Sequence, residues 1–273
     1  MKRKTGWLIF VMSMLLFLSG CFSINEPITA ESEGIWNNFF VYPLSQLMIW
    51  IANWIKSYGF AIIIVTVLFR ILLLPLTIKQ TKSMRAMQQL QPKMQALKET
   101  YSAKDRNTTM KLNQEMQALF SKHKVNPFSG CLPLVIQMPI FLAIYHAIMR
   151  TDHFEGETFA WFALTNADPY FILPVLACVL TFLQQKMMMV QNSPQMKILL
   201  YAMPIMILVI GVVLPAAVVL YWIAGNVFMI LQTYFMNRSA NVAISGQMIE
   251  QPVKRSNQQS KSKKKKKRPK KRK

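Results

Sequence analysis

Acidic residues are scarce in this chain, and they are absent from its most apolar stretches. Only 11 of the 273 residues are Asp or Glu, against 32 Lys and Arg. Five long apolar stretches between positions 58 and 236 contain neither an acidic residue nor a serine. A carboxylate relay of the kind that proton-coupled pumps use inside a membrane is therefore excluded. An intramembrane serine nucleophile is excluded in the same stretches.

Cysteine and histidine are also rare, and their spacing indicates no metal site. The three histidines do not follow a metal-ligand spacing, and no cysteine pattern suggests a disulfide framework. No phosphate-binding loop or other catalytic motif is present. The sequence therefore predicts no catalytic residue, no metal and no cofactor, and it favours a protein that is not an enzyme. Two of the cysteines, Cys131 and Cys178, lie in or beside apolar stretches and are expected to be packing residues.

Charge is low in amount and strongly positive in sign. Charged residues make up 16% of the chain, whereas a soluble domain typically has about 25%. Apolar residues make up 53%, yet the formal net charge is +21. This combination favours a membrane protein with basic cytoplasmic segments over a soluble nucleic-acid-binding protein.

The first 20 residues have the pattern of a secretion signal. Residues 2–4 are basic, residues 7–18 are apolar, and Leu18-Ser19-Gly20-Cys21 resembles a bacterial lipobox. We therefore predict cleavage before Cys21 and a covalent lipid, such as palmitate, on its side chain. An ordinary signal peptide and a retained anchor helix are the alternatives.

Five apolar stretches are long enough to cross a bilayer of about 30 Å. We therefore predict an all-α membrane protein with five transmembrane helices. Only Pro215 separates the last two stretches, so they must form a tight helical hairpin. Neighbouring helices can re-satisfy backbone groups freed by a proline kink. The predicted spans are residues 58–78, 131–150, 170–190, 198–214 and 216–236, and prolines interrupt four of them, at Pro75, Pro139, Pro174 and Pro204.

Residues 21–57 precede the first predicted span and are expected to lie outside the cell. Within this segment, Trp36–Lys56 is amphipathic rather than uniformly apolar. Its tryptophans suit the headgroup region of a membrane. We predict a helix that lies on the outer membrane surface, with a sixth span as the alternative. The apolar residues at helical spacing are Phe40, Leu44, Leu47, Ile51 and Trp54.

Residues 79–130 are predicted to form a cytoplasmic helical hairpin. Apolar residues from Met87 to Tyr101 recur at alternating steps of three and four, which is the pattern of a coiled-coil seam. The pattern returns from Thr109 to Leu119, after a polar apex at residues 102–107. Pro92 lies inside the first arm and is expected to bend it. The methionines of the seam could adapt to varied apolar sequences, or the seam could simply pack on itself.

Lysine and arginine are distributed unequally between the two sides of the predicted membrane. Residues 79–130 contain ten Lys and Arg against three acids, and residues 238–273 contain fourteen against one. The segments 21–57 and 151–169 together hold one Lys and seven acids. The positive-inside rule therefore places residues 79–130, the short loop 191–197 and the tail 237–273 in the cytoplasm. The tail from Pro252 onward is low in complexity and expected to be disordered.

One arginine, Arg70, lies inside the first predicted span. A guanidinium does not deprotonate in proteins, and its placement at the bilayer centre costs roughly 2.5–3.5 kcal/mol on insertion scales. No acidic residue of any span can neutralise it. This favours a wet cavity around Arg70 over partial snorkelling towards the inner headgroups.

Polar residues of the other spans concentrate at a similar depth, in the inner half of the predicted membrane. Their helical spacing places them on one face of each span, so that convergence of these faces would form a hydrophilic groove open to the cytoplasm. A role as interhelical hydrogen-bonding residues is the alternative for each amide. The candidate groove residues are Thr66, Arg70, Gln137, Gln184 or Gln185, Trp222, Asn226 and Gln232.

Several motifs together resemble the YidC/Oxa/Alb family of membrane-protein insertases over about residues 36–238. The lipobox and the basic tail resemble the short form that is found in Gram-positive bacteria. The matching stretches are Arg70 with residues 75–80, residues 90–93, 126–127, 131–133 and 137–141, and residues 214–217 leading to Leu220-Tyr221-Trp222.

The resemblance implies a membrane protein insertase and chaperone of the bacterial cell membrane. The positively charged groove residue of the family corresponds to Arg70, and its polar groove positions correspond to Gln137, Gln184, Trp222 and Gln232. The implied substrates are nascent membrane proteins. The ribosome, the Sec translocon and anionic lipids are further candidate partners, and the basic tail could bind ribosomal RNA phosphates or lipid headgroups.

Two other functions remain open at this point. A small transporter for an anionic solute or lipid could use the same arginine, although such carriers often have internal repeats and none is evident here. A structural assembly factor that only holds other membrane proteins together is the third function.

Overall fold

The computed structural model describes residues 26–102, 105–123, 125–126, 132–189 and 194–250, and it does not describe the side chains of residues 132–134, 194–196 and 239–250. The predicted signal and Cys21 lie outside the described residues, as does the tail from residue 251. By its internal contacts the chain divides into residues 1–233 and residues 234–273.

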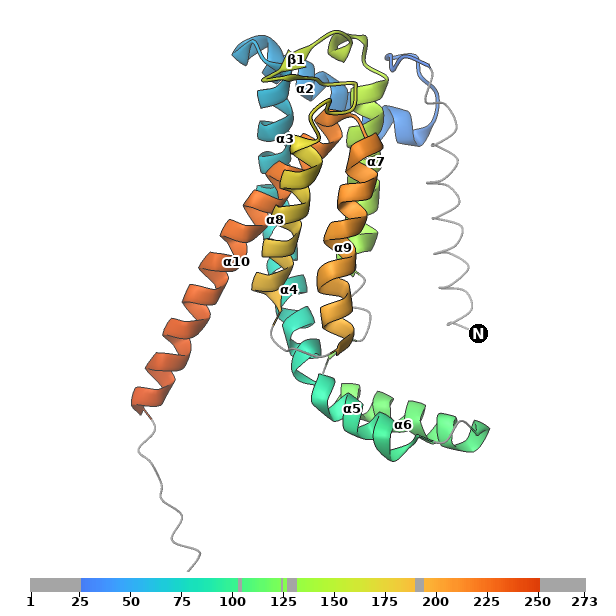
Figure 1. The fold of residues 1–273 in the computed structure, drawn as a ribbon, viewed down its shortest axis with the longest axis vertical. Coiled ribbons are helices and arrows are strands. Elements are labelled where there is room, and N and C mark those ends of the chain that lie inside the picture. The colour runs from blue at the N-terminus through green and yellow to red at the C-terminus, as the bar shows by residue number, and fades with distance from the viewer. Residues whose placement is uncertain (1–25, 103–104, 124, 127–131, 190–193, 251–273) are drawn as a thin grey trace, which may run out of the picture. The chain divides into compact units, whose positions relative to one another are not determined.

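The described part of the chain is mostly helical (Figure 1). A π-helical turn, η1, precedes the α-helices, and a 3₁₀ turn with two short strands lies between α7 and α8. In chain order the elements are η1 (Asn37–Val41), α2 (Tyr42–Ile55), α3 (Tyr58–Leu72), α4 (Leu74–Gln89), α5 (Gln91–Thr100), α6 (Arg106–Lys122), α7 (Leu132–Met149), η3 (Asp152–Phe154), β1 (Thr158–Phe159), β2 (Phe162–Ala163), α8 (Ile172–Met188), α9 (Pro194–Val213) and α10 (Ala216–Glu250).

The first predicted span is divided between two helices. Helix α3 ends at Leu72, α4 begins at Leu74, and the chain bends by 65° between them. Pro75 occupies the first turn of α4. A proline has no N–H to continue the ladder, and its ring clashes with the carbonyl four residues earlier. The kink expected at Pro75 is therefore a break, and Arg70 lies in the last turn of α3.

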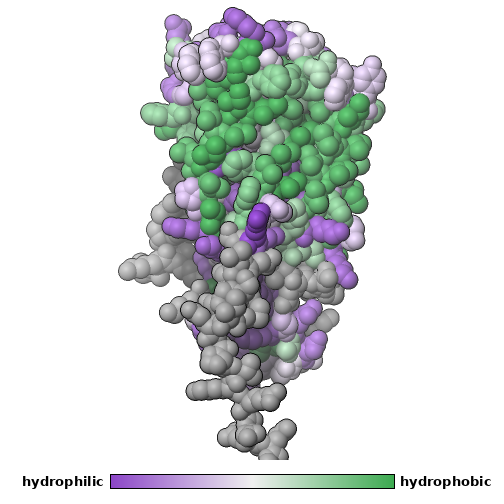
Figure 2. Space-filling view, turned by 90° about the vertical axis from the view of Figure 1, so that its left-hand side faces the viewer, coloured by the Kyte–Doolittle hydropathy of each residue, from purple (hydrophilic) through white to green (hydrophobic). Residues whose placement is uncertain are grey.

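Length and apolarity support fewer membrane crossings than the sequence predicts. Within the described ranges, Ala216–Arg238 is long and apolar enough to cross a membrane, and the bent pair of α3 with Leu74–Thr100 would make a second crossing. The shorter apolar helices are Val135–Met149, Ile172–Met188 and Lys197–Val213. The four later predicted spans each overlap one helix, the first is divided between α3 and α4, and five crossings stay a prediction. Hydrophobic residues form a broad band on one face, with hydrophilic residues above and below it (Figure 2).

The last helix extends beyond the predicted span. The span was expected to end at Met236 and the tail to begin at residue 237, but α10 continues to Glu250. No proline occurs between Ala216 and Pro252, so nothing in this stretch removes a helical hydrogen bond in the way that Pro252 would.

The loop between α7 and α8 contains a small antiparallel hairpin that the all-α prediction did not include. Thr158 pairs with Ala163, and Phe159 pairs with Phe162. The two-residue turn between the strands places Ala160 at a positive φ of 56°. The Phe159 ring packs against Phe60 of α3, with ring centroids 5.1 Å apart. The hairpin thus covers the beginning of α3.

The amphipathic segment is helical, but its apolar residues divide between two faces. Leu44 and Ile51 are buried, and α2 packs on α3 through this side. Phe40 and Trp54, which the sequence placed on the same face, are exposed, and Trp54 is 81% exposed. The buried face contributes to the core, and the position of the exposed aromatic residues at a membrane surface stays a prediction.

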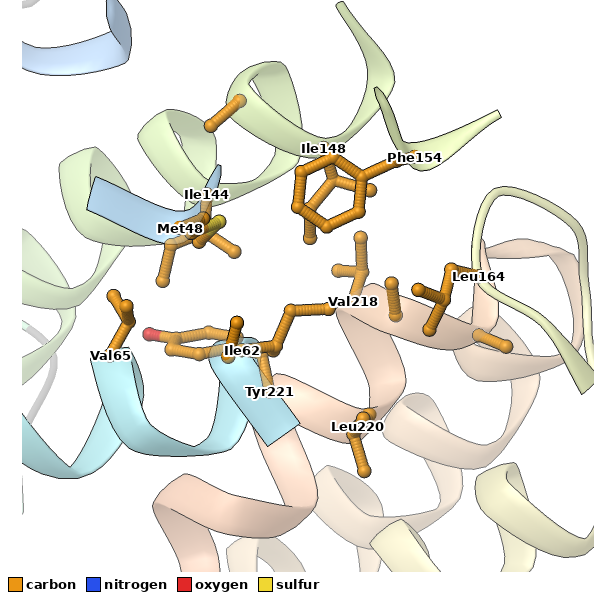
Figure 3. Packing of buried hydrophobic residues seen from close by; sticks show 14 of the residues in the cluster. Met48, Ile62, Val65, Ile144, Ile148, Phe154, Leu164, Val218, Leu220 and Tyr221 are labelled. Atoms are coloured by element: carbon orange, nitrogen blue, oxygen red, sulfur yellow. The ribbon is translucent and has the colours of Figure 1, made fainter. Parts of the chain in front are cut away.

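One hydrophobic core connects α2, α3, α7, the loop between α7 and α8 and the first turns of α10 (Figure 3). Met48 comes from α2, Ile62 from α3, Ile144 from α7 and Val218 from α10, and all are at most 1% exposed. The backbone also joins these parts, because Ala217 N–H donates to the Leu164 carbonyl at 3.0 Å. This core holds the beginnings of α3 and α10 together, and both helices continue from it towards Arg70.

Helices α5 and α6 contact each other within the residues predicted to form the cytoplasmic hairpin. The Lys93 ammonium lies 3.0 Å from Nε2 of His123. Asp105 caps α6 by accepting a hydrogen bond from the Thr108 backbone N–H at 2.9 Å. Hydrogen bonds from Thr108 lower the pKa of Asp105, because they stabilise its ionised form.

Candidate functional site

Arg70 is half-buried in the last turn of α3, next to α10. Its guanidinium lies against Gly225 of α10 and interacts electrostatically with Tyr221. Among the described residues, none forms an ion pair or a hydrogen bond with it. A partly buried cation without an acidic partner retains the capacity to attract an anion.

Tyr221 is a polar neighbour of Arg70 that the sequence reasoning named only as part of a motif. It is 3% exposed, and its ring points from α10 towards α3 (Figure 3). The side-chain amide of Gln137 in α7 donates a hydrogen bond to the Tyr221 hydroxyl. A tyrosine in an apolar helix usually needs a hydrogen-bond partner for its hydroxyl. That requirement is the feature of the sequence that could have identified Tyr221 as a site residue. Tyr221 therefore connects two predicted site residues, Arg70 and Gln137.

Trp222 lies next to Tyr221 in the sequence and packs against α7. Its ring meets Phe141 edge to face, with centroids 5.8 Å apart and an interplanar angle of 70°. Phe141 is four residues after Gln137, so both lie on one face of α7. Helix α10 thus contacts this face of α7 through two successive aromatic residues.

Two predicted groove residues have hydrogen-bond partners that indicate packing. The Thr66 hydroxyl donates to the carbonyl of Ile62, one turn earlier in α3, at 2.7 Å. The Asn226 amide donates to the Thr181 hydroxyl of α8 at 2.8 Å, and both side chains are buried. The second contact has the form of an interhelical polar bond inside a membrane bundle.

The two predicted glutamines in the C-terminal parts of their predicted spans are also hydrogen-bonded. Gln184 donates to the sulfur of Met188 in its own helix at 2.6 Å. Gln232 donates to the hydroxyl of Thr77 at 3.2 Å, which joins α10 to α4. Arg70, Gln137 and Trp222 are therefore brought together around Tyr221, whereas Gln184 and Asn226 bond to residues of α8.

Potential metal ligands do not gather in this structure. Over the described ranges, no three residues among His, Cys, Asp and Glu are placed to hold a metal ion.

Comparison with known proteins identifies the family to which this chain belongs. A family model described as "60Kd inner membrane protein" matches residues 50–243. The membrane protein insertase YidC 1 of Halalkalibacterium halodurans is 61% identical over 237 residues, which cover 86% of this chain and 92% of that protein. The membrane protein insertase MisCA of Bacillus subtilis is 52% identical over 240 residues, which cover 86% of this chain and 92% of that protein.

Similarity to a solved structure points to the same family. It is described as an active YidC insertase crystal structure with the first transmembrane domain resolved, and it matches with a TM-score of 0.60 at 26% identity. The match covers 74% of this chain and 47% of that chain, so the present chain spans about half of the larger protein. The resemblance seen in the sequence motifs is confirmed: this chain belongs to the 60Kd inner membrane protein family, the family of the YidC membrane protein insertases, and is a protein of the bacterial cell membrane.

Proposed function

We propose that this chain inserts nascent membrane proteins with one or two spans into the cytoplasmic membrane, without ATP. Its relatives, which are named membrane protein insertases, are matched over more than nine tenths of their length. The observation that carries the proposal is the half-buried Arg70, which has no acidic counter-ion in the described part of the chain.

Capture is electrostatic in this mechanism. An acidic residue in the short outer segment of the substrate takes the place of the counter-ion that Arg70 does not have. Attraction between opposite charges 4 Å apart is about 4 kcal/mol at an effective dielectric constant of 20, compared with about 1 kcal/mol in water. The half-buried position of Arg70 therefore strengthens this attraction.

Polar side chains around Arg70 lower the barrier to the passage of the outer segment. A buried polar group without a hydrogen bond costs roughly 1–3 kcal/mol by protein mutational data. Gln137 donates a hydrogen bond to the buried Tyr221 hydroxyl, and in this proposal the carbonyl and second amide hydrogen of the partly exposed Gln137 bind substrate or water. The hydrophilic groove of this proposal is lined by these residues with Trp222, and it opens to the cytoplasm.

Release follows when the apolar helix of the substrate moves into lipid. Burial of apolar surface drives this step, and the membrane potential acts on the acidic outer segment. In this arrangement the lipid on Cys21 anchors the N-terminus outside. Residues 79–130 receive the nascent chain in the cytoplasm, and the basic tail binds the ribosome or anionic lipid.

Reconstitution in liposomes tests the proposal. The substrates are a single-span protein with an acidic outer segment and its variant with neutral amides in that segment. Arg70→Ala should lower insertion of the acidic substrate by about tenfold or more, given the attraction above, and should spare the neutral one. Arg70→Lys, which keeps the charge, should largely retain insertion of both.

The same liposomes separate the other functions. Unchanged insertion of every acidic substrate by the Arg70→Ala variant would show that capture by Arg70 is wrong. Uptake of an anionic solute or scrambling of an anionic lipid, without insertion, would favour the transporter. Neither activity would favour an assembly factor.

A further inference from the structure

Gly225 lies where a side chain would collide with the functional cation. A Cβ atom built on Gly225 would be 2.7 Å from an Nη atom of Arg70, 3.4 Å from its Nε and 3.5 Å from its Cζ. These are the three nearest heavy atoms, and all belong to Arg70. The space left by the missing side chain is therefore occupied by the guanidinium.

The other helical glycines with close neighbours serve a different purpose. A Cβ on Gly211 of α9 would meet Pro174 of α8 at 3.3 Å, so that glycine lets two helices approach. A Cβ on Gly59 of α3 would overlap the ring of Phe159 from the hairpin between α7 and α8. Both are packing contacts. At Gly225 the neighbour is the flexible end of a charged side chain.

The position of Gly225 on α10 explains how the guanidinium is oriented. Tyr221 precedes Gly225 by four residues, so the two lie on one face of the helix. Arg70 lies along this face, against Gly225 and within electrostatic reach of the Tyr221 hydroxyl. Gln137 donates to that hydroxyl from the other side. A bulkier residue at 225 would push the guanidinium away from this group.

We propose that Gly225 is a positioning residue, which holds the Arg70 guanidinium on α10 beside Tyr221 and so sets where an acidic substrate residue is captured. The inference rests on the proposed function, because it assigns a role to Arg70 in capture. It does not depend on helix packing, since the atoms that Gly225 accommodates belong to Arg70.

The substitution Gly225→Ala should have opposite effects on substrate capture and on the stability of the fold. A methyl group at 225 displaces the guanidinium, which can rotate away because its side chain is long and flexible. The helix itself gains, because alanine favours a helix more than glycine does. Gly225→Ala should therefore weaken capture without lowering the stability of the folded protein.

The substitution Arg70→Lys provides a matched background for the test, because lysine carries the same charge on a less bulky end group. A lysine side chain has no atoms at the positions of the two guanidinium Nη atoms, the closest of which lies 2.7 Å from the built Cβ. The clash is thus removed while the positive charge is kept. Gly225→Ala should matter with the natural Arg70 and have little effect in the Arg70→Lys background.

The insertion experiment compares four proteins: the natural chain, Gly225→Ala, Arg70→Lys and the double variant. A displacement of about 1 Å at 4 Å separation should lower insertion of the acidic substrate about fourfold in Gly225→Ala. The double variant should match Arg70→Lys, and the neutral substrate and a Gly211→Ala control should show no such selectivity. Equal losses with acidic and neutral substrates, or in both backgrounds, would indicate a packing role and overturn the proposal.

A second measurement tests the geometry without relying on insertion. Phenylglyoxal modifies arginine, and its rate at Arg70 can be followed by peptide mass spectrometry on the full chain in bilayers. The rate at Arg70 should rise severalfold in Gly225→Ala, while the rate at Arg106, which is exposed on α6, serves as an internal reference. An unchanged rate at Arg70 overturns the positioning role. If Gly225→Ala changes the modification rate at Arg70 but Arg70→Ala leaves insertion unchanged, Gly225 positions the guanidinium. In that case Arg70 does not capture the substrate, and the proposed function is wrong.

Discussion

Two arginines near opposite ends of the helical region have very different surroundings. Arg150 follows α7 and is 3% exposed; its Nε donates to the Glu26 carbonyl at 2.7 Å, and its Nη1 donates to Asn37 Oδ1 at 2.8 Å. Arg70 is half-buried and has no such acceptor in the described part of the chain. The first cation is used to hold the structure together, and the second is left available.

The difference shows what the fold does with the cost of a buried charge. At the C-terminal end of α7, hydrogen bonds from Arg150 compensate its desolvation. They attach residues 26–37 to α7 together with the Ile28 N–H, which donates to the Arg150 carbonyl at 2.7 Å. At Arg70 no described residue provides an ion pair or a hydrogen bond, so the desolvation of its charge is left partly uncompensated. An uncompensated charge is typical of a binding residue rather than of a structural one.

The largest expected effect on stability is at Arg150. Arg150→Met removes two hydrogen bonds from a charged donor, and each is worth roughly 1.5–3 kcal/mol. We expect the free energy of unfolding to fall by about 3 kcal/mol, with loss of insertion that is equal for acidic and neutral substrates. Titration with a denaturing detergent measures the first quantity, and Arg70→Met is the control, with no loss of stability. Equal destabilisation by both variants would remove the distinction between the two regions.

An intermediate effect, on insertion of the acidic substrate, is expected from removal of the Tyr221 hydroxyl. Tyr221→Phe keeps the ring in the core and removes the acceptor of the Gln137 amide. A hydrogen bond of this kind contributes about 1 kcal/mol, which corresponds to about fivefold in insertion of the acidic substrate. Liposome insertion assays measure this, with Gln137→Leu and the double variant completing the cycle. Additive losses would contradict the shared role, because the second substitution should have no further effect.

The smallest effect is expected at the bond between α10 and α8. Asn226→Ala and Thr181→Val each break one buried interhelical hydrogen bond, which averages about 0.6 kcal/mol in membrane proteins. We expect this loss in the free energy of unfolding and unchanged insertion, as befits a packing contact. A detergent-unfolding cycle of both single variants and the double variant measures the coupling. Selective loss of insertion with acidic substrates would instead place Asn226 in the binding site.

Residues that stand out chemically were found from the sequence, and residues that matter through their neighbours were not. Arg70 is identifiable because a guanidinium inside an apolar span requires an explanation wherever the chain folds. Gln137 and Trp222 follow from polarity and helical spacing. Gly225 carries no signal of its own, since glycine is common in membrane helices and its role depends on a side chain 155 positions earlier in the chain.

The same reasoning explains where the structure adds detail that the predicted fold did not contain. The helices follow from apolar periodicity, but periodicity reports neither the break at Leu73, which Pro75 causes, nor the extension of α10 to Glu250. The hairpin at residues 158–163 is stabilised by contact with α3. The division of Leu44 and Trp54 between two faces depends on where α3 packs.

The amino-acid order alone predicts that this chain is helical, apolar, unevenly basic and has an arginine, Arg70, within its first apolar stretch, because these properties follow from residue chemistry and spacing. Which groups surround that cation is a matter of three-dimensional packing. Gly225, Tyr221 and Gln137 come from two helices that are distant from Arg70 in the sequence, and only the close approach of α3, α7 and α10 places them against one guanidinium.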